Sequence, residues 1–322
     1  MVQPLPSLAE IESAEVLINA VVPSTPQFSW PLLNERTGCE LWVKHENHTA
    51  IGSFKMRGAF NYITKLRERE PGLTGVIAAT RGNFGQAVAF GARHYGLTAT
   101  IVVPHGNSRG KNSAMRALGA ELIEHGDDFQ AALEFSEHLA AKRRLHWIPS
   151  YHRDLVTGNA VSTLSFLRAS PALERVYVPI GMGSGICAMI AARDALGVPT
   201  KILGVATELT PAIALSFAAK RVVSHPVSTR IADGMACSTP NSEPLAHILR
   251  GVERIVTVTD DEIEAAMRDY FTDTHNVAEG ACGAGLAAVL KERPINHGQR
   301  VGVIFTGGNV DQPVFLRVMA GS

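Results

Sequence analysis

Lys55 lies within residues 53–59, of sequence SFKMRGA, where it follows an aromatic residue and precedes two small ones. Small neighbours allow a bulky group to approach the backbone, and a lysine in this setting is a candidate for forming a Schiff base. The same segment predicts a helix from Phe54 to about Leu66. Because most lysines are solvated surface groups, this segment by itself does not identify a function.

A glycine-rich turn at Gly181–Gly185, of sequence GMGSG, lies between a predicted strand and a predicted helix. Glycines there let backbone N–H groups converge on a phosphate, the helix N-terminus adds a favourable partial charge, and Ser184 can donate its hydroxyl. A dinucleotide-binding turn is the alternative. It needs a small residue at its third glycine position, which Ile186 occupies, whereas Glu208 would suit a ribose hydroxyl. The turn alone leaves both ligands open.

Two further turns carry polar groups that follow buried strands. Thr306–Asn309, of sequence TGGN, is either a tight turn or a site that presents a hydroxyl to a ligand. Residues 80–86, of sequence TRGNFGQ, join a predicted strand to a helix start. Free N–H groups at a helix N-terminus bind carboxylates well, although the segment also reads as an ordinary strand-to-helix turn.

Lys55 and the turns at Gly181–Gly185 and Thr306–Asn309 together resemble the pyridoxal-phosphate (PLP) enzymes of fold type II, in the threonine/serine dehydratase family. The resemblance covers most of the chain. It implies that Lys55 binds PLP as a Schiff base. It further implies that the cofactor is bound by Phe54, Lys55, Asn83, Gly181, Met182, Gly183, Ser184, Gly185 and Thr306. Within that set, Thr306 would face the pyridine nitrogen and Asn83 the 3′-oxygen.

Residues 80–84 resemble the family's loop for the substrate carboxylate, which implies that the substrate is bound by Thr80, Arg81, Gly82, Asn83 and Phe84. Two positions depart from the family pattern. Arg81 replaces a small residue, which in serine racemases is the acid/base serine of the second face. Phe84 replaces a histidine. We therefore predict dehydration without racemisation and a more apolar substrate, of which 3-phenylserine is the example. Arg81 could stack on a ring, pair with a second carboxylate, or point to solvent.

The resemblance implies an ammonia-lyase, a dehydratase that converts a β-hydroxy-α-amino acid of the threonine/serine type to a 2-oxo acid and ammonia. Lys55 would remove the α-proton as the catalytic base. Hydroxyaspartate dehydration, β-replacement and threonine-synthase-like chemistry are alternatives within the fold. Outside this chemistry, the alternatives are an NAD-binding oxidoreductase and a PLP-binding protein without catalysis.

Short apolar runs alternate with helical patterns along the chain, which predicts parallel sheets covered by helices. Predicted strands are Val76–Ala79, Thr98–Val103, Glu121–Ile123, Val176–Ile180, Ile202–Val205 and Val301–Phe305. Predicted helices include Phe84–Tyr95, Ser113–Leu118, Phe129–Lys142, Ile186–Leu196, Asp260–Phe271 and Val277–Leu290. The resemblance implies the tryptophan-synthase-β-like α/β fold with two open parallel-sheet domains. Residues 1–60 and 148–322 would form the large PLP-binding domain, with 61–147 inserted as the small one.

Composition sets limits on partners and location. The 322 residues contain 30 Lys+Arg and 30 Asp+Glu, so a zero formal net charge gives no basic surplus for nucleic acid. No apolar run is long enough to span a bilayer, and residues 1–6 lack the pattern of a secretory signal. We expect a cytoplasmic homo-oligomer, a dimer, that acts on a small amino acid. Four widely spaced cysteines are expected to be reduced core thiols: Cys39, Cys187, Cys237 and Cys282.

The sequence does not predict a metal site. His45–His48 has two histidines at a spacing one residue short of the helical zinc pair, and we interpret it as a solvated strand end. Some relatives bind a divalent cation through an acidic pair, but alanines occupy the corresponding positions, Ala206 and Ala212, and Glu208 is out of register.

Overall fold

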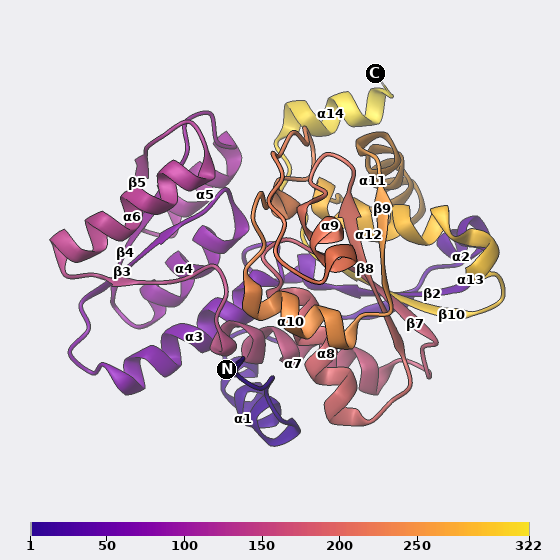
Figure 1. The fold of residues 1–322 in the computed structure, drawn as a ribbon, viewed down its shortest axis with the longest axis horizontal. Helices are drawn as coiled ribbons and strands as arrows, with labels where there is room; N and C mark the ends of the chain where they lie inside the picture. Colours follow the sequence, from indigo (N-terminus) through magenta and orange to yellow (C-terminus); the bar gives the residue numbers. More distant parts are fainter. Residues whose placement is uncertain (1, 322) are drawn as a thin grey trace.

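The computed structural model describes residues 2–321, which form two open, almost entirely parallel sheets with helices on both faces (Figure 1). The larger sheet has six strands in the order β1 (Gln27–Ser29), β2 (Glu40–His45), β10 (Arg300–Phe305), β7 (Arg175–Pro179), β8 (Lys201–Thr207) and β9 (Arg254–Val258). Within it, β1 is antiparallel to β2. The smaller sheet has four parallel strands in the order β5 (Glu121–Glu124), β4 (Thr98–Val103), β3 (Gly75–Ala79) and β6 (His146–Trp147). The predicted α/β class is confirmed.

Apolar side chains on both faces of the central strands explain why helices cover both faces of each sheet. In the larger sheet, Tyr177 packs in a core with α12 (Gly280–Lys291), whereas Val176 and Val178 pack with α8 (Ser184–Leu196). In the smaller sheet, the faces of β3 and β4 pack on α3 (Lys55–Arg69) with α4 (Asn83–His94), and on α6 (Phe129–Arg143). Such two-sided burial is typical of parallel sheets.

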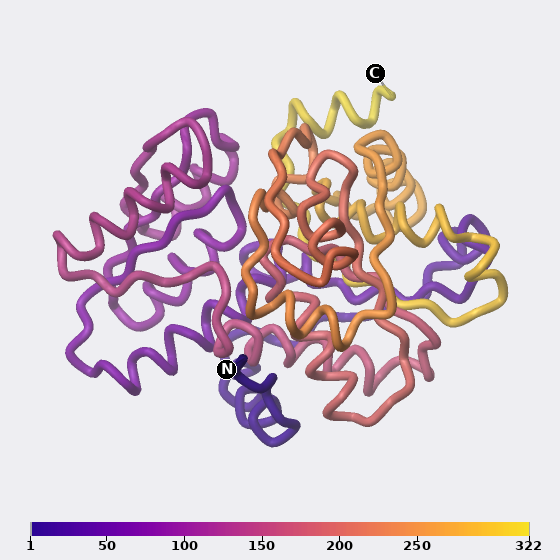
Figure 2. Tube along the Cα trace, viewed as in Figure 1, coloured from indigo at the N-terminus to yellow at the C-terminus, as the bar shows by residue number. Residues whose placement is uncertain are grey.

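The other helices complete these layers. They are α1 (Leu8–Asn19), α2 (Pro31–Thr37), α5 (Arg109–Ala117), α7 (Arg153–Ala169), α9 (Ala212–Ala219), α10 (Ser242–Gly251), α11 (Asp260–Thr274), α13 (Arg293–Asn296) and α14 (Gln312–Ala320), with the short 3₁₀ helices η1 (Glu46–His48) and η2 (Asp233–Met235). The chain enters the smaller sheet after α3 and leaves it before α7, as its colour sequence shows (Figure 2). We propose residues 61–147 as the inserted domain, with residues 1–60 and 148–322 as the large one.

Close contact between α3 and α7 sets the position of the N-terminal end of α3. A Cβ atom at Gly158 would lie 2.4 Å from the carbonyl oxygen of Arg57, so only glycine allows the helices to approach this closely. The backbone N–H of Gly58 also donates to Asn159 Oδ1 at 3.1 Å. The first turn of α3, which contains Lys55, is therefore packed tightly against α7, on the side of the larger sheet.

Two local predictions are wrong. The helix predicted from Val277 begins at Gly280, because Glu279 has an extended backbone whose N–H donates to Gly307 O at 3.1 Å. The residues His45 and Glu46, interpreted as solvated, are both fully buried. His45 stacks on Phe305, and burial lowers the pKa of His45 to about 4, while Glu46 forms a buried ion pair with Arg57.

The four cysteines are buried and free, as predicted, and burial raises the pKa of each thiol. Within residues 2–321, no helix combines the length and the apolar character needed to cross a membrane. The same residues contain no cluster of three or more His, Cys, Asp or Glu side chains that could hold a metal ion.

Candidate active site

A cavity of about 140 Å³ is lined by the predicted site residues, which come from loops and helix starts of both sheets. Its wall includes the first turn of α3, the loop from β3 to α4, the loop from β7 to α8, and the start of the loop after β10. Every residue predicted to bind cofactor or substrate lines it: Phe54, Lys55, Thr80, Arg81, Gly82, Asn83, Phe84, Gly181, Met182, Gly183, Ser184, Gly185 and Thr306. Segments separated by more than a hundred positions in sequence thus form one site.

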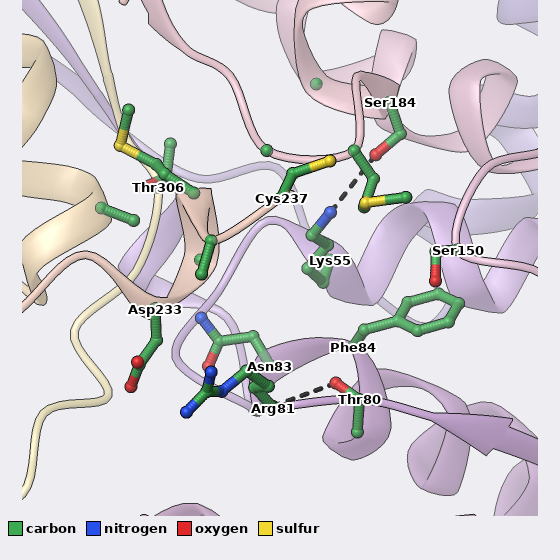
Figure 3. Close-up of a pocket in the computed structure, with 18 of the residues that line it drawn as sticks. Lys55, Thr80, Arg81, Asn83, Phe84, Ser150, Ser184, Asp233, Cys237 and Thr306 are labelled. Atoms are coloured by element: carbon green, nitrogen blue, oxygen red, sulfur yellow. Dashed lines mark hydrogen bonds between the residues drawn. The ribbon is translucent and has the colours of Figure 1, made fainter. Parts of the chain in front are cut away.

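Lys55 is the first residue of α3 and extends toward the loop before α8 (Figure 3). Its Nζ atom donates to Ser184 Oγ at 3.3 Å and lies 4.7 Å from the centroid of the Phe54 ring. The backbone N–H of Phe54 donates to the carbonyl oxygen of Thr306 at 3.1 Å. The predicted Schiff-base lysine is therefore tied through the backbone to Thr306 and through its side chain to the predicted phosphate loop.

Two lysines line the cavity, and their surroundings shift their pKa values in opposite directions. Burial by the surrounding protein lowers the pKa of Lys55 to about 8, although nearby Glu279 opposes this shift. Burial also acts to lower the pKa of Lys111, but the negative charges of Glu279, Asp233 and Asp311 together outweigh it and raise that pKa. A neutral amine attacks a carbonyl group and an ammonium does not, so Lys55 is the better nucleophile.

The loop at Gly181–Gly185 is shaped by contacts that exclude side chains. A Cβ at Gly181 would lie 2.3 Å from Gly234 O, and Gly183 has a φ of +99° that favours glycine. Gly183 precedes α8, and no side chain caps this helix. The first N–H groups of a helix have no partner within the helix, so this loop presents free donors to an anion.

The loop from β3 to α4 presents a second helix N-terminus to the same cavity. The hydroxyl of Thr80 accepts from the N–H of Gly82 at 3.0 Å, which fixes the turn. No side chain caps α4, whose first residues are Asn83 and Phe84. A carboxylate can therefore bind here while a phosphate binds at α8.

Arg81 and Phe84, the two departures from the family loop, both face this cavity. The Nε atom of Arg81 is buried without a hydrogen-bond partner, and within residues 2–321 its guanidinium makes no ion pair within 4.0 Å. Figure 3 places Arg81 and Asp233 on the side of the cavity away from Ser184, while Phe84 extends to the side where Ser150 lies. Arg81 as a whole is half-buried, so it lines the cavity without being closed off from solvent.

The sequence assigned no function to Lys111, Asp233 and Glu279, which line the cavity, nor to Asn309, which donates to Asn83. Lys111 comes from α5, Asp233 from η2, Glu279 from the turn before α12, and Asn309 from the end of the TGGN turn. Asn309 ends the TGGN turn at Thr306–Asn309, but its contacts were not predicted. No local pattern distinguishes Lys111 or Asp233 from solvated residues, and Glu279 was masked by the helix predicted across it.

These features define a class of protein. A lysine of lowered pKa and an uncapped helix N-terminus fit an aldehyde cofactor that bears a phosphate, and two open α/β units enclose them. That is the fold and site of the type II PLP enzymes. The chain also matches the family model described as pyridoxal-phosphate dependent enzyme over residues 18–307. It belongs to this family, and its cofactor is PLP.

Similar proteins include ammonia-lyases and a racemase. The chain is 33% identical to an L-threonine ammonia-lyase of Thermotoga maritima, over 97% of this chain and 78% of that one. It is 30% identical to an L-threo-3-hydroxyaspartate ammonia-lyase of Saccharomyces cerevisiae, over 98% and 97% of the two chains. The crystal structure of a PLP-dependent aspartate racemase superposes with a TM-score of 0.90, at 30% identity over 97% and 98%.

Proposed function

We propose that this protein is an ammonia-lyase that dehydrates a β-hydroxy-α-amino acid to a 2-oxo acid and ammonia. The observation that carries the proposal is the position of Lys55, whose Nζ lies 3.3 Å from Ser184 Oγ in the cavity that also contains Thr80–Phe84. When bound, PLP supplies a ring that withdraws electrons from the α-carbon of the substrate. The similarity to two ammonia-lyases supports this reaction over β-replacement.

In this proposal the protein's own groups bind the substrate and move its proton. The N–H groups at the start of α4 bind the substrate carboxylate. Lys55 removes the α-proton as a general base, for which its lowered pKa suits it. The β-hydroxyl then leaves as water with a proton supplied by the Lys55 ammonium or by the phosphate group of the cofactor, and hydrolysis of the resulting enamine gives the 2-oxo acid and ammonia. The hydroxyl of Thr306 would contact the pyridine nitrogen of PLP. A hydroxyl does not hold this nitrogen protonated as a carboxylate would, so the ring is a milder electron acceptor.

We further propose that the substrate carries an apolar or aromatic β-substituent, with 3-phenylserine as the representative. Phe84 makes the rim of the substrate loop more apolar than a histidine would. A buried aromatic ring contributes several times the stabilisation of a methyl group, because far more apolar area leaves water. Arg81 supports a second candidate, 3-hydroxyaspartate, since a guanidinium without an acidic partner can bind a second carboxylate in a bidentate manner.

The expected result is that kcat/KM for 3-phenylserine at least equals that for threonine and serine. A site that recognises a ring-sized apolar group can favour the substrate that carries it by roughly ten- to hundred-fold in kcat/KM. The measurement is 2-oxo acid formation from 3-phenylserine, threonine, serine and 3-hydroxyaspartate under one condition. Phe84→His is the matched variant, and it should lower the ratio of phenylserine to threonine efficiency. A preference for threonine or serine contradicts the aromatic substrate. A preference for hydroxyaspartate that Arg81→Gln removes favours the second candidate, and no ammonia from any of the four contradicts the lyase.

Dehydration is expected to proceed without useful racemisation. A racemase needs a second acid/base group on the opposite face of the α-carbon, and the position of the racemase serine is occupied by Arg81. A guanidinium does not lose its proton near neutral pH, so it is a poor base. Chiral chromatography after incubation with one serine enantiomer measures the other enantiomer. Inversion at a rate equal to that of 2-oxo acid formation would contradict this prediction, whereas Arg81→Ser is expected to increase inversion.

A further inference from the structure

We propose that Glu279 is a positioning residue of the cofactor site, which acts with Asn309 to hold the amide of Asn83 in one orientation. The proposal rests on the predicted contact of Asn83 with the 3′-oxygen of PLP and is independent of the substrate. Glu279 is not itself placed on the reacting atoms. It acts through Asn83, so its effect is expected on cofactor binding.

Glu279 occupies an unusual position for a residue that precedes a helix. It is the last residue before α12, yet its carboxylate does not cap that helix. The side chain is only 8% exposed and lies against the turn after Thr306. Gly307 makes room for it, because a Cβ atom at that position would lie 2.6 Å from Glu279 Oε1. A buried carboxylate is costly without partners, so its hydrogen bonds indicate what it does.

Both the nitrogen and the oxygen of the Asn83 side-chain amide form hydrogen bonds, and each partner can bond to only one of these two atoms. Its Nδ2 donates to Glu279 Oε1 at 2.6 Å, and its Oδ1 accepts from Asn309 Nδ2 at 2.8 Å. Asn309 is itself oriented, since its Nδ2 also donates to the carbonyl oxygen of Ile51 at 2.8 Å. Turning the Asn83 amide over would set oxygen against a carboxylate and nitrogen against nitrogen.

This orientation leaves one hydrogen of Asn83 for the cofactor. An asparagine amide has two N–H donors, and Glu279 accepts one of them. In the described part of the chain, Asn83 Nδ2 has no second acceptor, and Asn83 lines the cavity. A donor therefore faces the space for the cofactor, which suits an anionic ring oxygen, whereas the reversed amide would present a carbonyl oxygen that repels it.

Only a carboxylate satisfies both neighbours of Glu279. Its second oxygen, Oε2, lies 3.3 Å from Lys111 Nζ, as an ion pair without the alignment of a hydrogen bond. A glutamine has one oxygen and one NH₂ group. In Glu279→Gln the NH₂ group must face either the ammonium of Lys111 or the NH₂ group of Asn83. The substitution keeps the shape of the side chain and removes one of its two acceptor oxygens.

The test is the dissociation constant of PLP, measured by titrating PLP into the purified protein after its own cofactor has been stripped. Glu279→Gln is expected to raise this constant about 5- to 100-fold, the effect of leaving one buried group unpaired or turned. Burial lowers the pKa of Lys55 to about 8, and the charge of Glu279 opposes this shift, so removing Glu279 also changes the protonation of Lys55 near that pH. The titration is therefore done at pH 9. At that pH the amine is mostly neutral with or without the carboxylate. Glu264→Gln, which removes a carboxylate that pairs with Arg317, is the control and should change nothing.

A double-mutant cycle shows whether Glu279 acts through Asn83. In an Asn83→Ala background, Glu279→Gln is expected to change the dissociation constant less than about twofold. The same factor in both backgrounds would overturn the proposal, as would a Lys111→Met variant that reproduces the whole increase. Asn309→Asp is an isosteric second variant that turns a donor into an acceptor, and an unchanged constant for it would also overturn the proposal. If Asn83→Ala alone binds PLP normally, the predicted contact on which the proposal rests is wrong.

Discussion

Replacement of Lys55 by alanine is expected to abolish turnover and to remove the near-visible absorbance of the bound cofactor. Without the amine, neither the covalent link to PLP nor the base for the α-proton remains. Loss of a general base alone typically lowers rates by roughly 10²–10⁴. The measurements are the absorbance spectrum of the purified variant and 2-oxo acid formation from the best substrate found in the panel.

Lys111→Met is the matched control for this experiment, because Lys111 is the other lysine that lines the cavity. Its raised pKa and its ion pair with Glu279 keep it an ammonium, so its removal should leave the absorbance band in place. Borohydride reduction followed by peptide mapping should locate the modified lysine at Lys55. A Lys55→Ala variant that retains both band and activity would show that another residue binds the cofactor.

Replacement of Arg57 by methionine is expected to destabilise the fold by about 3–5 kcal/mol, the typical effect of leaving one buried charge unpaired. Arg57 and Glu46 are almost completely buried, and Arg57 Nε lies 2.9 Å from Glu46 Oε2. Arg57 also donates to the carbonyl oxygens of Val22 and Pro23 at 3.1 and 2.9 Å. Among residues 2–321, its loss leaves the Glu46 carboxylate with one hydrogen-bond donor, the hydroxyl of Thr25 at 2.6 Å.

Denaturant unfolding of the cofactor-free protein measures this effect, with Arg317→Met as the control. Arg317 pairs with Glu264 at the surface, where such pairs contribute less than about 1 kcal/mol. The double variant Glu46→Met with Arg57→Met should be more stable than Arg57→Met alone, because it removes the unpaired charge. Equal unfolding free energies for Arg57→Met and Arg317→Met would contradict the importance of the buried pair. Since Arg57 lies two positions from Lys55, the variant is also expected to bind PLP less well.

The sheets were predictable because their determinants are local. Val76–Ala79 is a continuous apolar run and Thr98–Val103 is rich in β-branched residues, and such runs form strands buried on both faces. The structure confirms them as β3 and β4, with every residue of β3 buried. The helix predicted from Phe54 to about Leu66 is α3, which begins at Lys55 and ends at Arg69, and the glycine-rich turn lies between a strand and a helix as predicted.

Other features escaped prediction because they depend on partners far away in sequence. His45 and Glu46 are polar, and a local pattern assigns polar residues to the surface. They are buried because Phe305 stacks on His45 and Arg57 neutralises Glu46. The N-terminal end of the helix predicted from Val277 was wrong for the same reason. Glu279 leaves the helix because its N–H group pairs with Gly307.

The sequence by itself determined the fold class through its apolar runs and the family through short motifs, and it predicted the segments that the structure brings to one cavity. Only the tertiary structure decided which polar groups meet. Glu279, Asn83, Lys111 and Asn309 come from four separate segments, and their contacts exist only where the two units face each other. Both lysines of the cavity are buried, and they differ in pKa because burial prevails at Lys55 whereas the charges of Glu279, Asp233 and Asp311 prevail at Lys111.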